Sequence, residues 1–277
     1  MSSHSPVAGQ PVGPLKGSLR AVRRQLAAVA RHGRWALQPD AFPRSVQGEA
    51  GPLYHVRKAP LGGEGDPALQ AGKQHNVAVV AALLDGIALT PRRPFSFARA
   101  VGPITTERGF VAGRALLGGC LIPTVGGGMC VVTNTIFALA VELGWTILER
   151  HGHSLAHPDL PAVELDATVR VPDVDLRVAP DRPVVLRLAV EDDSLVVRVH
   201  ADGIPPAVVV RRVNARAWVE GGVVYRADRV LRAVDGGPWK EVAVNRRRVV
   251  PTEQRHRSCW TCGETGCHER DAALKLR

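Results

Sequence analysis

The sequence predicts an α+β fold in which a cysteine-bearing helix packs on a mainly antiparallel β-sheet. Helical patterns end by residue 143; the clearest, residues 74–84, places Val77, Val80, Ala81 and Leu84 on one face. From residue 167 onward, apolar and polar residues alternate over short stretches, which is typical of half-buried strands. Because no segment of helical length separates these stretches, their strands should pair antiparallel.

The first 40 residues predict a disordered start followed by a basic amphipathic helix. Residues 1–14 are polar and rich in Pro, Gly and Ser, whereas residues 16–37 repeat apolar side chains at helical spacing among many arginines. Such a helix fits either an anionic membrane surface or docking on the domain with its basic face in solvent. Residues 38–72 contain many Pro and Gly and predict irregular chain.

The remaining elements follow from local patterns. The helix over residues 74–84 should end at Asp85-Gly86, and residues 94–99 should be extended. Glycines break residues 101–121 into short strands and loops. Further strands are expected over residues 145–150, 167–171, 176–178, 184–190, 195–200, 208–213, 217–219 and 223–231, with a hairpin turn at 191–194.

The net charge of +10 lies mainly at the two ends of the chain. Residues 1–39 carry an excess of six positive charges and residues 241–277 an excess of three, which leaves about +1 for residues 40–240. Aromatic residues make up 4% of the chain and do not alternate with basic ones. The composition therefore argues against a nucleic-acid-binding groove in the fold.

The sequence predicts a cytoplasmic protein with reduced thiols. No apolar segment of a secretory signal follows the N-terminal residues, and no apolar stretch reaches the ~20 residues that span a bilayer. If residues 16–37 bind anionic lipid, the protein would be peripheral at the inner membrane surface. We expect three parts: residues 1–40, a main domain over 41–235, and a C-terminal tail over 236–277.

A glycine-rich turn with a cysteine is the strongest chemical signal. Gly126, Gly127 and Gly128 allow close backbone approach, and Met129 and Cys130 follow directly. Because residues 131–143 are apolar and lack proline, Cys130 should begin a helix, where the dipole and unpaired N–H groups lower a thiol pKa. Cys130 is thus a candidate nucleophile, with backbone N–H groups from Gly128 to Val131 as an oxyanion site. The alternative is a structural turn with a buried cysteine.

Two histidines compete for the role of general base. His151 and His153 are two residues apart and would share one side of a strand; His153 is favoured and His151 comes second. Asp166 is the first choice for the acid that orients the histidine, and Asp175 is the second. For Asp166, capping of a turn before a strand is the alternative.

Two arginines, Arg108 and Arg150, each have a structural role as an alternative to a role in the site. Arg108 is the candidate for bidentate binding of a substrate carboxylate, against a structural salt bridge. Arg150 follows Glu149, and a local ion pair is the expectation for such a dipeptide.

The order of these motifs resembles that of the VanW family, named for an accessory protein of vancomycin-resistance operons. The family pattern is P-x-E-x-F-S-F, V-G, R-G-[FY], G-G-G-[LVM]-C-Q, E-R-H-x-H-S, D-A-T-V and D-L. Order and spacing agree from Asn76 to Val199, so the VanW-like core should span about 76–200. One departure is that the glutamine after the family cysteine is Val131 here. The matching residues are Pro91, Pro94–Phe97, Val101-Gly102, Arg108–Phe110, Gly126–Cys130, Glu149–Ser154, Asp166–Val169 and Asp175-Leu176.

The resemblance implies a role related to peptidoglycan. Larger surface proteins with this domain are thought to act as cysteine-dependent transpeptidases that join stem peptides. One hypothesis is therefore a cysteine acyltransferase or amidohydrolase that acts on a peptide-like substrate or cell-wall precursor. The other is a non-catalytic accessory or binding module.

A Cys/His cluster in the C-terminal tail predicts a metal-binding knuckle. The pattern H-x2-C-x2-C-x4-C-H supplies three cysteines and two histidines within thirteen residues. In a reduced compartment this favours structural zinc over an iron–sulfur cluster, and a tail of reactive thiols is the alternative. Arg246, Arg247 and Arg248 lie on its basic flank. The ligand candidates are Cys259, Cys262, Cys267, and His268 or His256.

Overall fold

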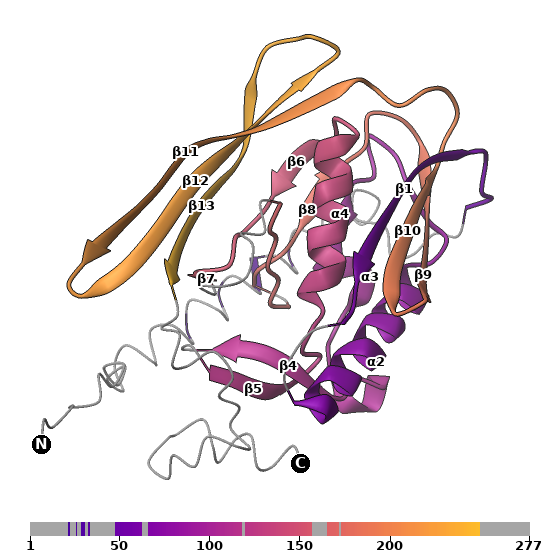
Figure 1. Ribbon diagram of the computed structural model, residues 1–277. Helices are drawn as coiled ribbons and strands as arrows, with labels where there is room; N and C mark the ends of the chain where they lie inside the picture. The colour runs from indigo at the N-terminus through magenta and orange to yellow at the C-terminus, as the bar shows by residue number, and fades with distance from the viewer. Residues whose placement is uncertain are drawn as a thin grey trace, which may run out of the picture.

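A central helix, α4 (Cys130–Glu142), lies between two mainly antiparallel sheets (Figure 1). It contacts β1 and β10 of one sheet and β11 of the other. The computed structural model describes residues 48–62, 66–117, 120–156, 165–171 and 173–249, together with Val22, Leu26, Val29, Ala30 and Gly33. The described chain is mixed α and β with mostly antiparallel pairing, so the predicted α+β class is confirmed.

The first sheet has the order β1-β10-β9-β2, with every pairing antiparallel. A tight hairpin joins β9 to β10, and Asp192 and Asp193 adopt positive φ in its turn, as the sequence predicts. Helix α2 packs on β9. The elements are β1 (Leu53–Pro60), α2 (Pro67–Leu84), β2 (Ile87–Leu89), β9 (Val184–Glu191) and β10 (Ser194–His200).

The second sheet is a meander of three long strands that ends on a short parallel strand, in the order β11-β12-β13-β7. The strands are β11 (Val208–Glu220), β12 (Val223–Val234), β13 (Lys240–Val249) and β7 (Leu155–Ala156). Arg232 of β12 is buried and donates to the carbonyls of Ala140, Val141 and Trp145. A cation at a helix C-terminus is favourable, so Arg232 fixes the meander to the end of α4.

Shorter elements complete the described chain. β6 runs into the loop that carries the two histidines, and α3 begins after Ser96, whose hydroxyl accepts from the Arg99 N–H. The sheet of order β3-β8-β6 comprises β3 (Phe95–Ser96), β8 (Arg177–Ala179) and β6 (Thr146–Glu149). The others are α3 (Phe97–Val101), the 3-10 turn η2 (Thr106–Arg108), and the paired β4 (Ala112–Leu117) and β5 (Cys120–Val125).

Strand β1 and the start of helix α2 lie within residues 38–72, for which the composition predicts irregular chain. α2 begins at Pro67, seven residues before the predicted start, because the Asp66 side chain caps the N–H groups of Ala68 and Leu69. β1 pairs with β10 at the sheet edge, where a terminal Pro60 is tolerated.

Residues 167–171 do not form the predicted strand. The backbone groups of Ala167 bind side chains of α4 instead: Ala167 O accepts from the Thr133 hydroxyl at 2.6 Å, and Ala167 N–H donates to Asn134 Oδ1 at 2.7 Å. Thr168 N–H donates to the carbonyl of His151, and Arg170 forms an isolated bridge with Val174, so these residues pair with several segments rather than with one strand. β13 lies within the segment expected as the tail and was not predicted from the sequence.

Within the N-terminal region, Val22, Leu26, Val29, Ala30 and Gly33 are helical. The rest of the predicted basic helix and the start of the chain lie outside the described residues. In the described chain, no helix combines the length and apolar character needed to cross a membrane.

The turn that starts α4 is held by close backbone contacts. Gly126 and Gly128 adopt left-handed φ values of 78° and 97°, which favour glycine. A Cβ on Gly127 would lie 2.3 Å from the carbonyl oxygen of Gly113 in β4. Buried Asn76 of α2 donates to the carbonyls of Gly127 and Val111 at 3.0 Å each, so α2, β4 and the turn are fixed together.

The substitution Gly127→Ala should destabilise the fold because backbone at 2.3 Å must move to admit the methyl group. We expect a loss of about 1–3 kcal/mol in the free energy of unfolding, measured by urea denaturation. Gly51→Ala is the matched control, since a Cβ there meets no atom within 4 Å. Equal stability of the two variants would contradict this account of the turn.

Candidate active site

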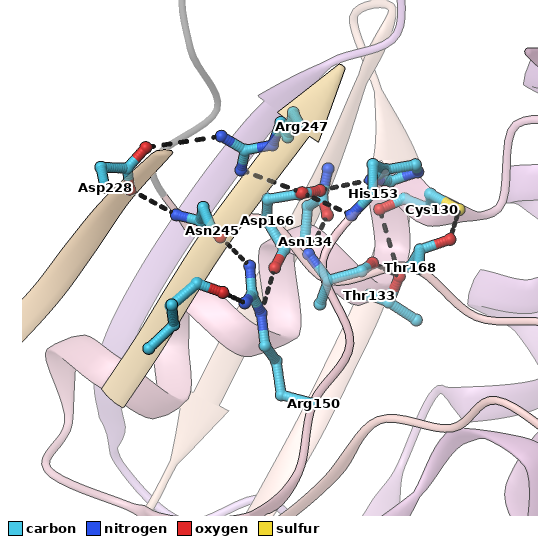
Figure 2. Close-up of polar contacts among 12 residues, drawn as sticks. Cys130, Thr133, Asn134, Arg150, His153, Asp166, Thr168, Asp228, Asn245 and Arg247 are labelled. Atoms are coloured by element: carbon cyan, nitrogen blue, oxygen red, sulfur yellow. Dashed lines mark hydrogen bonds and ion pairs between the residues drawn. The ribbon is translucent and has the colours of Figure 1, made fainter. Parts of the chain in front are cut away.

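Cys130 is the first residue of α4, and its thiol faces two side chains from other segments (Figure 2). Its Sγ lies 3.6 Å from the hydroxyl oxygen of Thr168, and the side chain of His153 is close enough to change the pKa of the thiol. Burial raises the pKa of the Cys130 thiol. The hydrogen bond and positive charge of His153, with smaller help from Val169 N–H and Thr168, outweigh burial and lower it.

His153 lies in the loop after β6 and is held by Asp166. The buried Asp166 carboxylate accepts from the His153 backbone N–H at 2.8 Å through Oδ2 and contacts imidazole Nδ1 through Oδ1. Because Nδ1 is engaged by the carboxylate, Nε2 is the ring nitrogen left for the Cys130 thiol. His153 and Asp166 were the first choices from the sequence, and the structure brings both together with Cys130 (Figure 2).

The charges of these three groups support one another. Burial lowers the pKa of His153, but its hydrogen bonds to Asp166 and Cys130 and the negative charges of these groups raise it to about 10. Burial raises the pKa of Asp166, but its bonds to His153 and the charge of Arg247 lower it to about 2. The arrangement favours a thiolate beside an imidazolium that a carboxylate orients, which are the parts needed for nucleophilic attack and proton transfer.

The other acid–base candidates lie apart from this cluster. His151 is on the surface, with Nε2 3.2 Å from Glu149 Oε1. Asp175 is fully buried and accepts from the Ser96 hydroxyl at 2.6 Å and from the Ala98 N–H at 2.8 Å, so it fixes the start of α3. Neither residue contacts Cys130 in these interactions.

The Arg108 guanidinium donates to the carbonyls of Val101 and Pro103 at 2.6 Å and 2.5 Å. Through these contacts, the Arg108 side chain stabilises the loop after α3. The prediction that Arg108 binds a substrate carboxylate is untested.

The glycine turn restricts where an oxyanion could bind. The N–H groups of Gly126, Gly127 and Val131 donate to the carbonyls of Val111, Thr124 and Gly128. Of the predicted oxyanion donors from Gly128 to Val131, the N–H group of Val131 is therefore already paired within the turn.

Several residues of the site were not singled out in the sequence. Thr133 and Asn134 are polar residues in an otherwise apolar helix, a signal that could have marked the α4 face toward residues 166–168. Arg150, which was expected to pair with its neighbour Glu149, makes contacts with distant segments. It donates to Asp166 O at 2.5 Å and to Asn245 of β13 at 2.5 Å.

The predicted metal ligands, Cys259, Cys262, Cys267, His268 and His256, lie outside the described residues. Among residues that the structure describes, no group of three or more His, Cys, Asp or Glu is arranged to hold a metal ion.

Comparisons with known proteins agree with the motif order. Residues 72–200 match the family model described as VanW like protein. The chain is 28% identical over 174 residues to the Vancomycin B-type resistance protein VanW of Enterococcus faecalis (strain ATCC 700802 / V583), covering 60% of this chain and 63% of that protein. Residues 72–200, a little under half of the chain, are therefore similar to the VanW family and are called the VanW region below.

A second relative is the uncharacterized protein YoaR of Bacillus subtilis (strain 168), 28% identical over 134 residues, or 48% of this chain and 44% of YoaR. This chain thus spans about half the length of the curated relatives it matches. No solved structure matches it significantly.

The VanW region starts inside α2 and ends with β10. It contains Cys130, His153 and Asp166, whereas β1 and the meander β11–β13 lie outside it. Val131, at the position of the family glutamine, lines a hollow of about 450 Å³ beside the first turn of α4 with Arg57, Lys58 and Asn134. An apolar side chain therefore stands where the VanW pattern has an amide.

The pKa of His153 makes stability depend on pH. The folded pKa of about 10 lies above the ordinary 6.5, so the stabilisation is fully present below about pH 6.5 and is lost as pH rises through 10. The wild-type protein should therefore have a higher free energy of unfolding than His153→Gln. This difference should be largest at pH 6 and smaller at pH 10.

Urea unfolding of both proteins at the two pH values measures this gap. His151→Gln is the control, because its exposed ring contacts only Glu149 among the described contacts and should matter by less than about 0.5 kcal/mol. An equal gap at both pH values would contradict the charged state assigned to His153.

Proposed function

We propose that this protein is a cysteine-dependent acyl transferase or amidohydrolase that acts on peptides of the peptidoglycan type. The observation that carries the proposal is the contact series Cys130–His153–Asp166, in which the thiol pKa is lowered and the imidazole is held by a buried carboxylate. The substrate class rests on the VanW resemblance and on the similarity to a relative named as a vancomycin resistance protein.

In the proposed reaction, the Cys130 thiolate attacks the carbonyl carbon of a peptide bond. The carbonyl oxygen gains negative charge, which N–H groups at the start of α4 would stabilise. Imidazolium Nε2 of His153 protonates the leaving amine as the C–N bond breaks, and a thioester remains on Cys130.

The second half of the reaction restores the thiolate. Neutral His153 removes a proton from an acceptor amine or from water, which attacks the thioester carbonyl. The C–S bond breaks, and the products are a new amide or a free carboxylate, a Cys130 thiolate and a His153 imidazolium. Asp166 keeps the imidazole in one orientation through both proton transfers.

The hollow lined by Val131 and Asn134 supports binding of a peptide near Cys130. Arg57 and Lys58 lie on its wall and would suit a peptide carboxylate, although Arg57 also pairs with Glu142.

The test is alkylation of the full chain by iodoacetamide at pH 7, with the modified cysteine located by peptide mass spectrometry. Cys130 should react about tenfold or more faster than in the urea-unfolded chain, since more of the thiol is ionised. His153→Ala should abolish this advantage, whereas His151→Gln should preserve it.

A Cys130 that reacts no faster than an unfolded thiol would remove the nucleophile. Function that survives Cys130→Ala would favour the other hypothesis, a non-catalytic accessory or binding module.

For the Cys/His cluster of residues 256–268 we propose a structural zinc site, on the spacing of its three cysteines. Elemental analysis of the purified chain should give about one zinc per chain, and Cys262→Ser should lose it. Iron with sulfide would indicate a cluster instead, and absence of both metals would leave a tail of free thiols.

A further inference from the structure

The Asp166 carboxylate has a second partner, contributed by the meander outside the VanW region. Arg247 of β13 is buried, and its Nη2 lies 3.0 Å from Asp166 Oδ2, the oxygen that also accepts from the His153 backbone N–H. Its Nη1 lies 3.6 Å from Oδ2 of Asp228, a second buried carboxylate on β12. One guanidinium therefore lies between two buried anions (Figure 2).

These contacts close into a ring. Asp228 Oδ1 accepts from Asn245 Nδ2 at 2.6 Å, and Asn245 Oδ1 accepts from Arg150 Nη2 at 2.5 Å. Arg150 Nε returns to the backbone carbonyl of Asp166 at 2.5 Å. Since its backbone and its carboxylate are both held, Asp166 has one orientation available toward the imidazole.

We infer that Arg247 is a positioning residue of the active site. By binding Oδ2 of Asp166, it holds the carboxylate so that Oδ1 lies against Nδ1 of His153. The inference rests on the proposed function. It follows that the strands beyond residue 200 complete a site whose reacting groups all lie within the VanW region.

The charges around this group set the direction of the effect. Cys130 and Asp166 face His153, while Arg150, Arg247 and Asp228 surround Asp166. Removal of the Arg247 cation leaves the negative charge of Asp166 and Asp228 less balanced and lets Asp166 turn away from His153. Both changes disfavour an anion at Cys130, so the pKa of the thiol should rise.

The experiment measures the rate of iodoacetamide reaction at Cys130 against pH in the full chain. Arg247→Met should move the inflection of this profile upward by about one pH unit. Arg247→Lys keeps the charge but cannot bridge two carboxylates, so it should restore part of the shift.

Arg212→Met is the matched control, because Arg212 contacts the same Asp228 at 3.2 Å from the outer side without reaching Asp166. It should lower the unfolding temperature as a lost ion pair does but leave the inflection in place. A purely structural role for Arg247 would give the same result as this control.

The outcomes separate the two proposals. In one outcome, the pH profile of Cys130 alkylation in wild type has its inflection below that of an ordinary thiol, and Arg247→Met does not move it. This result overturns the positioning role but leaves the proposed function standing. An ordinary thiol inflection in wild type overturns the proposed function itself. If Arg247→Met does not fold, Arg247→Gln, which can still donate to Asp166, replaces it; failure of both and of Arg247→Lys to fold would assign Arg247 a structural role only.

Discussion

A single buried carboxylate, that of Asp166, determines how the parts of this protein meet. An ionised carboxylate is costly to bury unless hydrogen bonds and an opposite charge compensate it. Here the compensation comes from three places: the His153 backbone and ring, the Arg247 guanidinium, and the neighbouring ring of polar contacts. Because each donor lies on a different segment, satisfying one anion requires the loop after β6, residues 165–168 and β13 to pack in one arrangement.

Arginines of the meander bind to the C-terminus of α4 and to Asp166, the carboxylate that holds His153. Arg232 of β12 donates to carbonyls at the helix C-terminus, and Arg247 of β13 reaches Asp166 near the helix N-terminus. Much of β11 is exposed, so apolar burial alone would hold the outer part of the meander weakly. Directional contacts from the two inner strands fix its position relative to α4, which is how strands outside the VanW region take part in the site.

The sequence predicted elements whose signals are local. Three glycines before an apolar run predicted a helix that starts at Cys130, and alternation around Asp192 and Asp193 predicted the β9–β10 hairpin. The sequence analysis placed His153 before His151 and Asp166 before Asp175 without a pattern that separates them, and the structure brings His153 and Asp166 to Cys130. By contrast, Arg247 lies 81 positions from Asp166 among consecutive arginines, where pattern alone indicates a basic flank. Which arginine of such a run turns inward depends on strand register, and register is set by pairing with β12.

The ring of contacts behind Asp166 also has a consequence for biosynthesis. Chain growth on the ribosome delivers α4, the histidine loop and residues 165–168 well before β12 and β13 emerge. Until residue 247 has left the exit tunnel, the Asp166 carboxylate lacks its contact with Arg247. If Arg247 positions Asp166 as inferred above, the thiol pKa of Cys130 is higher in the nascent chain than after β13 has paired with β12.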